Sequence, residues 1–280
     1  MSKGIAKTTN LTTSGLVAHN TAGNWDFLYE HSTVKNPNYN IGDRVVLPDG
    51  RVFRYGKTAQ AVSTMKMAMC TGNRLVAEYT SPYCRPTASI AVGDKSATFT
   101  CEALIGASRD GVIAEDELRG GYISIYGSSS YRPQRGIIGN SAKAADGTSI
   151  TLYFDAPFET EIAADSKTEI MANPYSNMYY SNGTSGMSGW LGMPNVIASA
   201  GEYMWVQTWG IFRISPIAAA IGDQRPRQLC FASNGGVRTH AASVDQDAAG
   251  SEQHCGFVME STVGEAQESA APFVNLQINP

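Results

Sequence analysis

Apolar and polar residues alternate along this chain in short stretches, and turn-forming residues separate the stretches. The clearest example is a pair of β-prone runs, Arg44–Leu47 and Arg51–Tyr55, on either side of Pro48-Asp49-Gly50. Proline presets φ for a turn and glycine accepts a positive φ. The segment is therefore predicted to be a β-hairpin, with one face of its second strand available for burial.

Comparable β-prone runs recur along the chain, whereas long patterns with a 3.6-residue period do not. They are Ser89–Val92, Ala97–Cys101, Gly121–Tyr126, Thr148–Phe154, Gly201–Ile214, Gln228–Ala232, Gly256–Glu260 and Phe273–Ile278. One short helix is predicted at Gln60–Cys70. Within the run at 201–214, Gly210 indicates a bulge or bend, and Tyr203, Trp205 and Trp209 are expected on one face if pairing is unbroken. The pattern predicts a mainly β protein of sandwich-like or barrel-like hairpin units.

Three regions follow from the distribution of these runs. Residues 1–40 are predicted to be an extended N-terminal arm ending in an aromatic anchor, because residues 2–24 are rich in Thr, Asn and Gly and lack apolar periodicity. Residues 41–155 are predicted to form a β domain. Residues 156–280 form either a second β domain or the second half of the same one.

Aromatic residues in the anchor and in two loop-like segments are the candidate contact residues. The segments are 126–140 and 173–189, both rich in Ser, Gly and Tyr, a mixture that makes adaptable contact surfaces. The alternatives are that the anchor closes one end of a core and that the segments are ordinary solvent loops. The candidates for subunit or capsid contacts are Trp25, Phe27, Tyr29, Tyr131, Tyr175, Tyr179 and Tyr180.

The chain has few charged residues, and their number and distribution argue against a nucleic-acid partner. Charged residues make up 16% of the 280 residues and the formal net charge is −4. The basic residues are scattered, so no nucleic-acid partner is expected. No apolar stretch has the length of a secretory signal or of a membrane helix, so no membrane partner is expected and synthesis is expected in a cytoplasm.

The five cysteines, Cys70, Cys84, Cys101, Cys230 and Cys255, are widely spaced and odd in number. They are interpreted as mostly reduced and buried. The pair His254–Cys255 lacks the further ligands that a structural zinc site needs. No metal site and no cofactor are predicted.

Catalytic signatures are not apparent. The four histidines, His19, His31, His240 and His254, lie in none of the local motifs of hydrolases or metalloproteases. Carboxylates cluster at 115–117 and 155–165, and three more (Asp245, Asp247 and Glu252) lack the spacing of a calcium loop. Paired acids are compatible with glycoside hydrolysis, but turn residues have the same appearance. The chain is predicted not to be an enzyme.

Three segments in the same chain carry a resemblance. IGDRVVLPDGRVFRY at 41–55, GEYMWVQTWGIF at 201–212 and APFVNLQ at 271–277 together resemble the virion decoration, or cement, proteins of tailed bacteriophages. The resemblance implies a β-rich protein on the capsid exterior that bridges subunits of the major capsid protein, commonly as a homotrimer. It implies no catalytic residues.

The expected function is therefore that of a virion structural protein that binds the outer surface of the phage head and stabilises the shell. Its expected partners are copies of itself and the major capsid protein. One alternative is a tail or head-fibre component that contacts host glycans, which requires exposed aromatic residues. Another is a β-fold glycan hydrolase, which requires two carboxylates in a groove.

Overall fold

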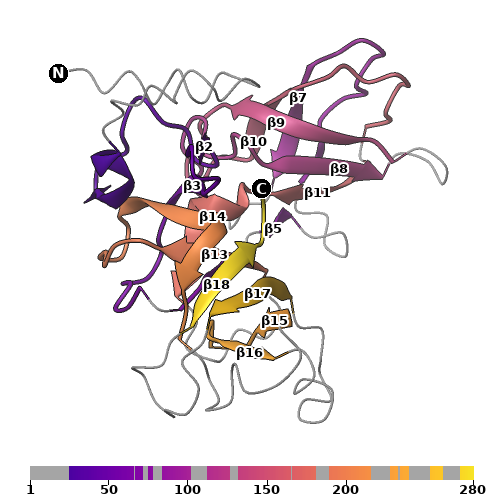
Figure 1. Ribbon diagram of the computed structural model, residues 1–280. Coiled ribbons are helices and arrows are strands. Elements are labelled where there is room, and N and C mark those ends of the chain that lie inside the picture. Colours follow the sequence, from indigo (N-terminus) through magenta and orange to yellow (C-terminus); the bar gives the residue numbers. More distant parts are fainter. Residues whose placement is uncertain are drawn as a thin grey trace. The chain divides into compact units, whose positions relative to one another are not determined.

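A computed structural model describes most of the chain as β structure. The described residues are 25–65, 67–71, 75–77, 84–101, 112–126, 132–164, 166–180, 189–215, 228–232, 234–239, 253–260 and 272–280. Their regular elements are strands and short 3-10 helices (Figure 1). The predicted mainly β class is confirmed.

The chain divides into two compact units. Unit 1 comprises Met1–Gly72 together with Tyr175–Pro280, and unit 2 comprises Asn73–Pro174. This division differs from the predicted boundary between residues 155 and 156, which falls inside unit 2. The physical reason is long-range pairing, since strands from the first and last quarters of the chain join one sheet.

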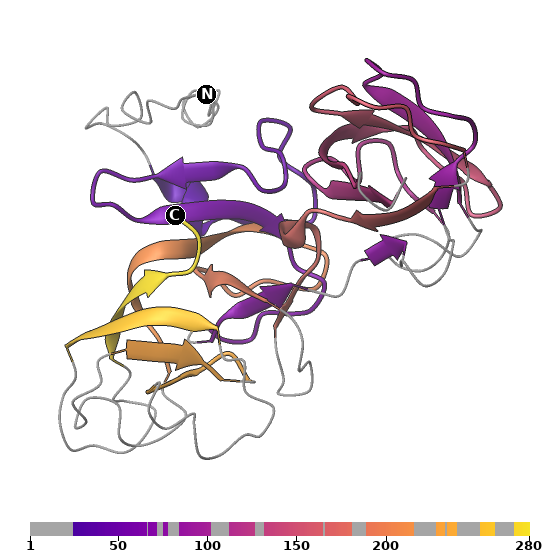
Figure 2. The same ribbon diagram turned by 90° about the vertical axis from the view of Figure 1, so that its right-hand side faces the viewer.

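Unit 1 contains an eleven-stranded antiparallel sheet whose main path runs β12-β4-β13-β14-β18-β17-β15-β16. The orange and yellow strands from the last part of the chain lie side by side in Figure 2. In addition, β1 and β3 pair with β14, and β2 pairs with β3. The strands are β1 His31–Ser32, β2 Arg44–Val46, β3 Val52–Lys57, β4 Met69–Thr71, β12 Met178–Tyr180, β13 Trp190–Pro194, β14 Tyr203–Arg213, β15 Gln228–Phe231, β16 Val237–Thr239, β17 His254–Glu260 and β18 Phe273–Gln277.

The long strand β14 has an irregularity at Thr208. Residues 203–209 pair with β3 and residues 209–213 pair with β18, and the register with β3 shifts between Gln207 and Trp209. The Thr208 hydroxyl donates to the Asn279 carbonyl at 2.6 Å, and the Thr208 carbonyl accepts from the Ile278 amide at 3.1 Å. Gly210 has φ +90°. The irregularity therefore lies at Thr208, two residues before the predicted position, because Gly210 itself pairs in register with Leu276. It interrupts the alternation that was expected to keep Trp209 on the face of Trp205.

Unit 2 contains a seven-stranded antiparallel sheet in the order β5-β11-β8-β9-β10-β7-β6. Its strands are β5 Leu75–Ala77, β6 Cys84–Pro86, β7 Ser96–Cys101, β8 Tyr122–Tyr126, β9 Gln134–Asn140, β10 Ser149–Phe154 and β11 Lys167–Met171. The sheet curls until β6 contacts β11, which makes it a nearly closed, barrel-like sheet. The Thr168 hydroxyl on β11 donates to the Cys84 carbonyl on β6 across this seam.

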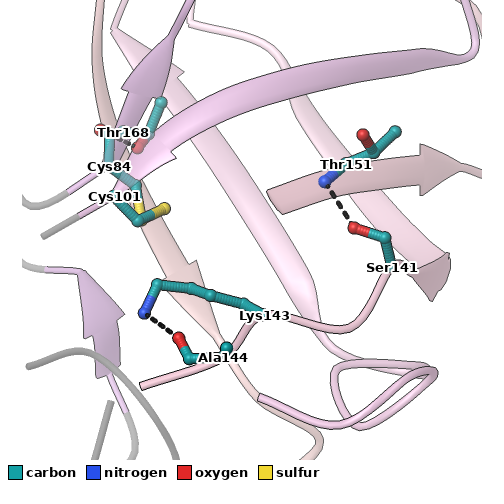
Figure 3. Close-up of a disulfide and its surroundings, with 7 residues drawn as sticks. All are labelled: Cys84, Cys101, Ser141, Lys143, Ala144, Thr151 and Thr168. Carbon is teal, nitrogen blue, oxygen red and sulfur yellow. Dashed lines mark hydrogen bonds between the residues drawn. A yellow bond between two sulfur atoms is a disulfide. The ribbon is translucent and has the colours of Figure 1, made fainter. Parts of the chain in front are cut away.

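A disulfide joins Cys84 to Cys101 on the adjacent strands β6 and β7 (Figure 3). Cys70, Cys230 and Cys255 are buried and belong to no disulfide within the described residues, as expected. The interpretation of the cysteines as mostly reduced is corrected for this one pair, because the hairpin places two cysteines that are 17 residues apart directly opposite each other.

Most predicted strands are confirmed, including the hairpin, in which Val45 pairs with Phe53. The helix predicted at Gln60–Cys70 is wrong: the described part of this segment is irregular until β4 begins at Met69. Ser89–Val92 is no strand and contributes a single bridge between Ile90 and Ile162. The terminal run at 273–278 is paired within the chain, with β14 and β17.

Candidate interaction surfaces

The predicted aromatic anchor is part of the core of unit 1. Residues Asp26–Tyr29 form a 3-10 helix, and Phe27 is buried with its ring 5.7 Å from that of Trp205, edge to face. Tyr39 lies 5.1 Å from the same indole. Residues 25–40 are therefore packed on β14, and the prediction of an arm over 1–40 is wrong for this part. Residues 1–24 lie outside the described residues.

Two candidate contact residues remain at the edge of this cluster. Tyr29 is 51% exposed, and Trp25 is partly buried 6.2 Å from Phe27. Phe27, in contrast, is only 8% exposed and is corrected from a contact residue to a core residue. Phe27 and Leu28, which follow Asp26, both belong to the core cluster, so this part of the 3-10 helix packs inward.

Polar and charged groups surround the edge of the aromatic cluster. His31 Nδ1 lies 2.8 Å from Glu202 Oε2, which ties β1 to the start of β14. The ammonium of Lys57 lies 5.4 Å from the centre of the partly exposed Tyr203 ring. Burial, together with the nearby Glu30 and Tyr55, raises the pKa of Tyr39 to about 12.

The tyrosines of the second loop-like segment have different positions. Tyr175 lies in the 3-10 helix Pro174–Asn177 and is buried, so it is corrected from a contact residue to a core residue. Tyr179 is partly buried against a core cluster, and Tyr180 ends β12. The segment expected as a loop at 173–189 therefore begins with regular structure. Tyr131 lies outside the described residues.

Among the described residues of unit 2, four exposed apolar side chains lie on the outside of the sheet. They are Met171, Tyr122, Ile138 and Tyr153, which are 41%, 44%, 54% and 45% exposed. They belong to the four consecutive strands β11, β8, β9 and β10. We call these four residues the outer apolar face of unit 2.

Sequence reasoning missed this face. In the sequence, such a face is marked by strands that have apolar residues on both sides. In β8, Ile123 and Ile125 are buried, whereas Tyr122 on the other side is exposed. A strand with only one buried face is expected to be polar on the other. Alternation along a β-prone run identifies its core positions, but it does not distinguish an outward tyrosine in a contact surface from an isolated exposed one.

A second, smaller group of exposed apolar residues lies on unit 1. Ile211 on β14, Met259 on β17 and Phe273 on β18 are 43%, 46% and 51% exposed. Arg213 lies directly opposite Phe273 in the register of β14 and β18. This group therefore includes a cation among its apolar side chains.

The candidate catalytic carboxylates have structural partners. Glu117 accepts a hydrogen bond from the Ala114 amide at 2.8 Å, and Asp155 accepts one from the Gly136 amide at 3.1 Å. The Nε2 atom of His254 lies 3.4 Å from Oε1 of Gln277. In the described part of the chain, no group of three or more His, Cys, Asp or Glu side chains is arranged to hold a metal ion.

Comparison with known proteins yields no relative: no protein-family model, curated protein or solved structure matches this chain. Among the described residues, no helix has the length and apolarity needed to cross a membrane.

Proposed function

We propose that this chain is a virion structural protein that binds the outside of a tailed-phage head and stabilises the shell as a decoration protein. It acts without catalysis or cofactors, as a homo-oligomer, a cyclic trimer, in contact with the major capsid protein. It is made in the host cytoplasm and ends on the capsid exterior.

The observation that carries this proposal is the outer apolar face of unit 2. Exposed apolar residues on four consecutive strands are a candidate surface for protein contacts, since the largest exposed apolar group of a soluble domain often has a function. The low charge content, 16%, reduces repulsion between copies that are packed densely on one shell. The resemblance of residues 41–55, 201–212 and 271–277 to decoration proteins supports the same function.

The experiment is to mix the purified protein with undecorated heads of a phage that encodes it. The expected result is saturable co-sedimentation, with a copy number that follows the number of capsid subunits, and a higher temperature of head disruption. Absence of binding to heads, or only a few copies per virion by quantitative mass spectrometry, would overturn the proposal.

A second candidate function is a fibre component that contacts host glycans. The partly exposed Trp25 and Tyr203 rings, with Lys57 and His31 beside the cluster, combine an aromatic surface with polar groups. Sugars stack on aromatic rings and hydrogen-bond to such polar groups. Binding to a glycan array that is lost in Trp25→Ala, together with a low copy number, would favour this function over decoration.

The third alternative is a glycan hydrolase, and an activity assay on the same purified protein distinguishes it from the two structural functions. Incubation with capsular and cell-wall polysaccharides should release no reducing ends if the protein is structural. Hydrolysis that is lost on replacing Asp155 or Glu159 would establish an enzyme.

A further inference from the structure

We propose that the disulfide between Cys84 and Cys101 acts as a redox-controlled latch on β6, the edge strand of the curled sheet of unit 2. With both cysteines as thiols, β6 opens away from the sheet and uncovers the sulfur atoms. With the disulfide formed, β6 stays closed over a buried pair of sulfur atoms. The latch acts within unit 2 and does not rest on the proposed function.

Strand β6 shares few backbone hydrogen bonds with β7. The Cys101 amide donates to the Thr148 carbonyl at 2.7 Å, on the side away from β6, so Cys84 and Cys101 form a non-hydrogen-bonded pair. Pro86, which lies opposite Phe99, has no amide hydrogen to donate. Of the three residues of β6, the middle one alone is therefore placed to exchange backbone hydrogen bonds with β7.

The side chains of β6 form a small part of the core of unit 2. Cys84 and Pro86 are buried, whereas Arg85 between them is exposed. At the seam, the Thr168 hydroxyl on β11 donates to the Cys84 carbonyl (Figure 3). On its buried side, β6 is therefore attached through two side chains and this hydrogen bond. Segments with few buried contacts are the ones that open locally while the rest of a domain stays folded.

The strands on either side of β6 are held by other partners. Residues 96–100 of β7 pair with β10, and residues 167–171 of β11 pair with β8. Two backbone hydrogen bonds between Ile90 and Ile162, at 2.9 and 3.0 Å, fix the chain that follows β6. Opening is therefore confined to β6 and the residues next to it, and Cys101 stays on β7 with its sulfur uncovered.

The disulfide supplies the attachment that β6 otherwise lacks. Its two cysteines are 17 residues apart in the sequence, and their Cα atoms lie 4.2 Å apart. With the bond intact, Cys84 cannot separate from β7. A disulfide of this span lowers the population of opened states by on the order of 100-fold.

Closure is a thiol–disulfide exchange with a small disulfide, such as oxidised glutathione. The thiolate of one opened cysteine attacks a sulfur atom of the small disulfide, which forms a mixed disulfide and expels one small thiolate. The second cysteine, also as a thiolate, attacks the protein sulfur of the mixed disulfide, which bonds Cys84 to Cys101 and expels the second small thiolate. Two electrons pass from the protein thiols to the small disulfide, and the two expelled thiolates take up the two protons that the cysteines lose.

The closed latch resists the reverse reaction. Cys84 and Cys101 are 0% and 2% exposed, and a reducing thiol must reach a sulfur atom to break the bond. Opening thus promotes closure, whereas closure hides the bond. A chain that is made in a reducing compartment would therefore be latched when it enters an oxidising one, and it would stay latched there.

The test is labelling of the native full chain with N-ethylmaleimide, followed for each cysteine by mass spectrometry. One sample is refolded in a reducing agent that is removed just before labelling, and a second is oxidised with glutathione disulfide. The internal controls are Cys70, Cys230 and Cys255, which are buried in unit 1 and belong to no disulfide within the described residues. In the reduced sample, Cys84 and Cys101 should label at least about 10-fold faster than the controls. In the oxidised sample they should not label.

Hydrogen exchange, measured by mass spectrometry, distinguishes local opening from unfolding of the whole unit. In the reduced chain, the amides of residues 84–87 should lose protection. The amides of β8, β9 and β10 should keep the protection that they have in the oxidised chain.

Two variants measure the opening of β6 without a disulfide. Cys84→Ser leaves Cys101 beneath β6 as a thiol, and its labelling rate reports how often β6 opens. Adding Thr168→Val removes the hydrogen bond across the seam and should raise this rate about five- to tenfold. The matched control is Thr151→Val, which removes a hydroxyl that bonds to Thr98 at an exposed position of the same sheet and should leave the rate unchanged.

Labelling of Cys84 and Cys101 as slow as that of the controls in the reduced chain would overturn the latch. So would loss of protection throughout β8, β9 and β10 on reduction, since the disulfide would then be needed to fold the unit rather than to hold β6. An effect of Thr151→Val as large as that of Thr168→Val would show that the opening does not occur at the seam of β6 and β11, and it would overturn the latch as well.

Discussion

Cys84 and Cys101 lie directly opposite each other on strands β6 and β7, and a disulfide joins them next to the seam where β6 meets β11. The disulfide links β6, the edge strand of the curled sheet of unit 2, to the adjacent strand β7. Both cysteines also belong to the core cluster of this unit. The position of the pair makes unit 2 dependent on the oxidation state of the protein.

Replacing both Cys84 and Cys101 with serine is expected to lower the free energy of unfolding of unit 2 by about 3 kcal/mol, as for a disulfide that closes a loop of this length. Chemical denaturation with and without a reducing agent measures the effect. The reducing agent should destabilise the unmodified protein and leave the double variant unchanged. Equal sensitivity of both proteins would show that this disulfide is not the cause.

Gly256 is expected to be intolerant of any side chain. Its φ is +138°, and a β-carbon there would lie 1.9 Å from the Asn275 carbonyl oxygen on the neighbouring strand β18. Gly256→Ala should therefore separate β17 from β18 and cost more than about 3 kcal/mol. The readout is the midpoint of urea unfolding.

The matched control for this change is Gly50→Ala in the hairpin turn. Gly50 also has a positive φ, +85°, but no atom lies within 4 Å of its β-carbon position. Only backbone strain of about 1–2 kcal/mol is expected there. If the two variants lose the same stability, the close approach of Asn275 has no special role.

Thr208 is expected to stabilise the register shift in β14. The variant Thr208→Val keeps the shape of this buried side chain but removes the hydroxyl that donates to the Asn279 carbonyl, so it should cost about 1–2 kcal/mol. Thr98→Val is the control, because that hydroxyl is exposed and bonds only to Thr151 among the described residues. The control should change stability by less than about 0.5 kcal/mol. Equal losses in the two variants, measured by urea unfolding, would contradict this role.

Tyr39 makes stability depend on alkaline pH. Its pKa is raised from 10.0 to about 12 in the folded protein. Well below pH 10.0 the phenol is neutral in both states. As the pH rises from about 10 to about 12, the unfolded phenol ionises first, so the free energy of unfolding falls by on the order of 1–2 kcal/mol.

The variant Tyr39→Phe tests this dependence. No described residue hydrogen-bonds the Tyr39 hydroxyl, so the variant should keep the stability at neutral pH or raise it by up to about 1 kcal/mol. It should also lose less stability than the unmodified protein between about pH 10 and 12. Thermal melting across this pH range measures both effects, and parallel curves for the two proteins would exclude the contribution of Tyr39.

Local features of the sequence were sufficient to predict the β class and the hairpin at residues 44–55. A turn made of Pro48, Asp49 and Gly50 depends on backbone preferences of consecutive residues, and the alternation beside it depends on which face is buried. Both are properties of neighbours in the chain. The strands at 121–126, 148–154 and 201–214 were predicted on the same basis.

The tertiary structure alone decided which segments are partners. Local apolarity indicates that Phe27 and Tyr175 are suited to burial or to an interface, but only the positions of β14 and its neighbours place them inside a core. Cys84 meets Cys101 for the same reason, through strand register.

The division into two units and the outer apolar face of unit 2 also depend on the tertiary structure. They arise when β3 pairs with β14, about 150 residues later, and when the sheet of unit 2 curls to bring β6 to β11. The sequence by itself determined local conformation, because turns and alternation act between neighbouring residues. Strand pairing joins residues that are far apart in the chain. Its backbone hydrogen bonds are the same for nearly every residue type, so they do not select the partner strand. The partner and the register are selected by the burial of side chains in the complete core.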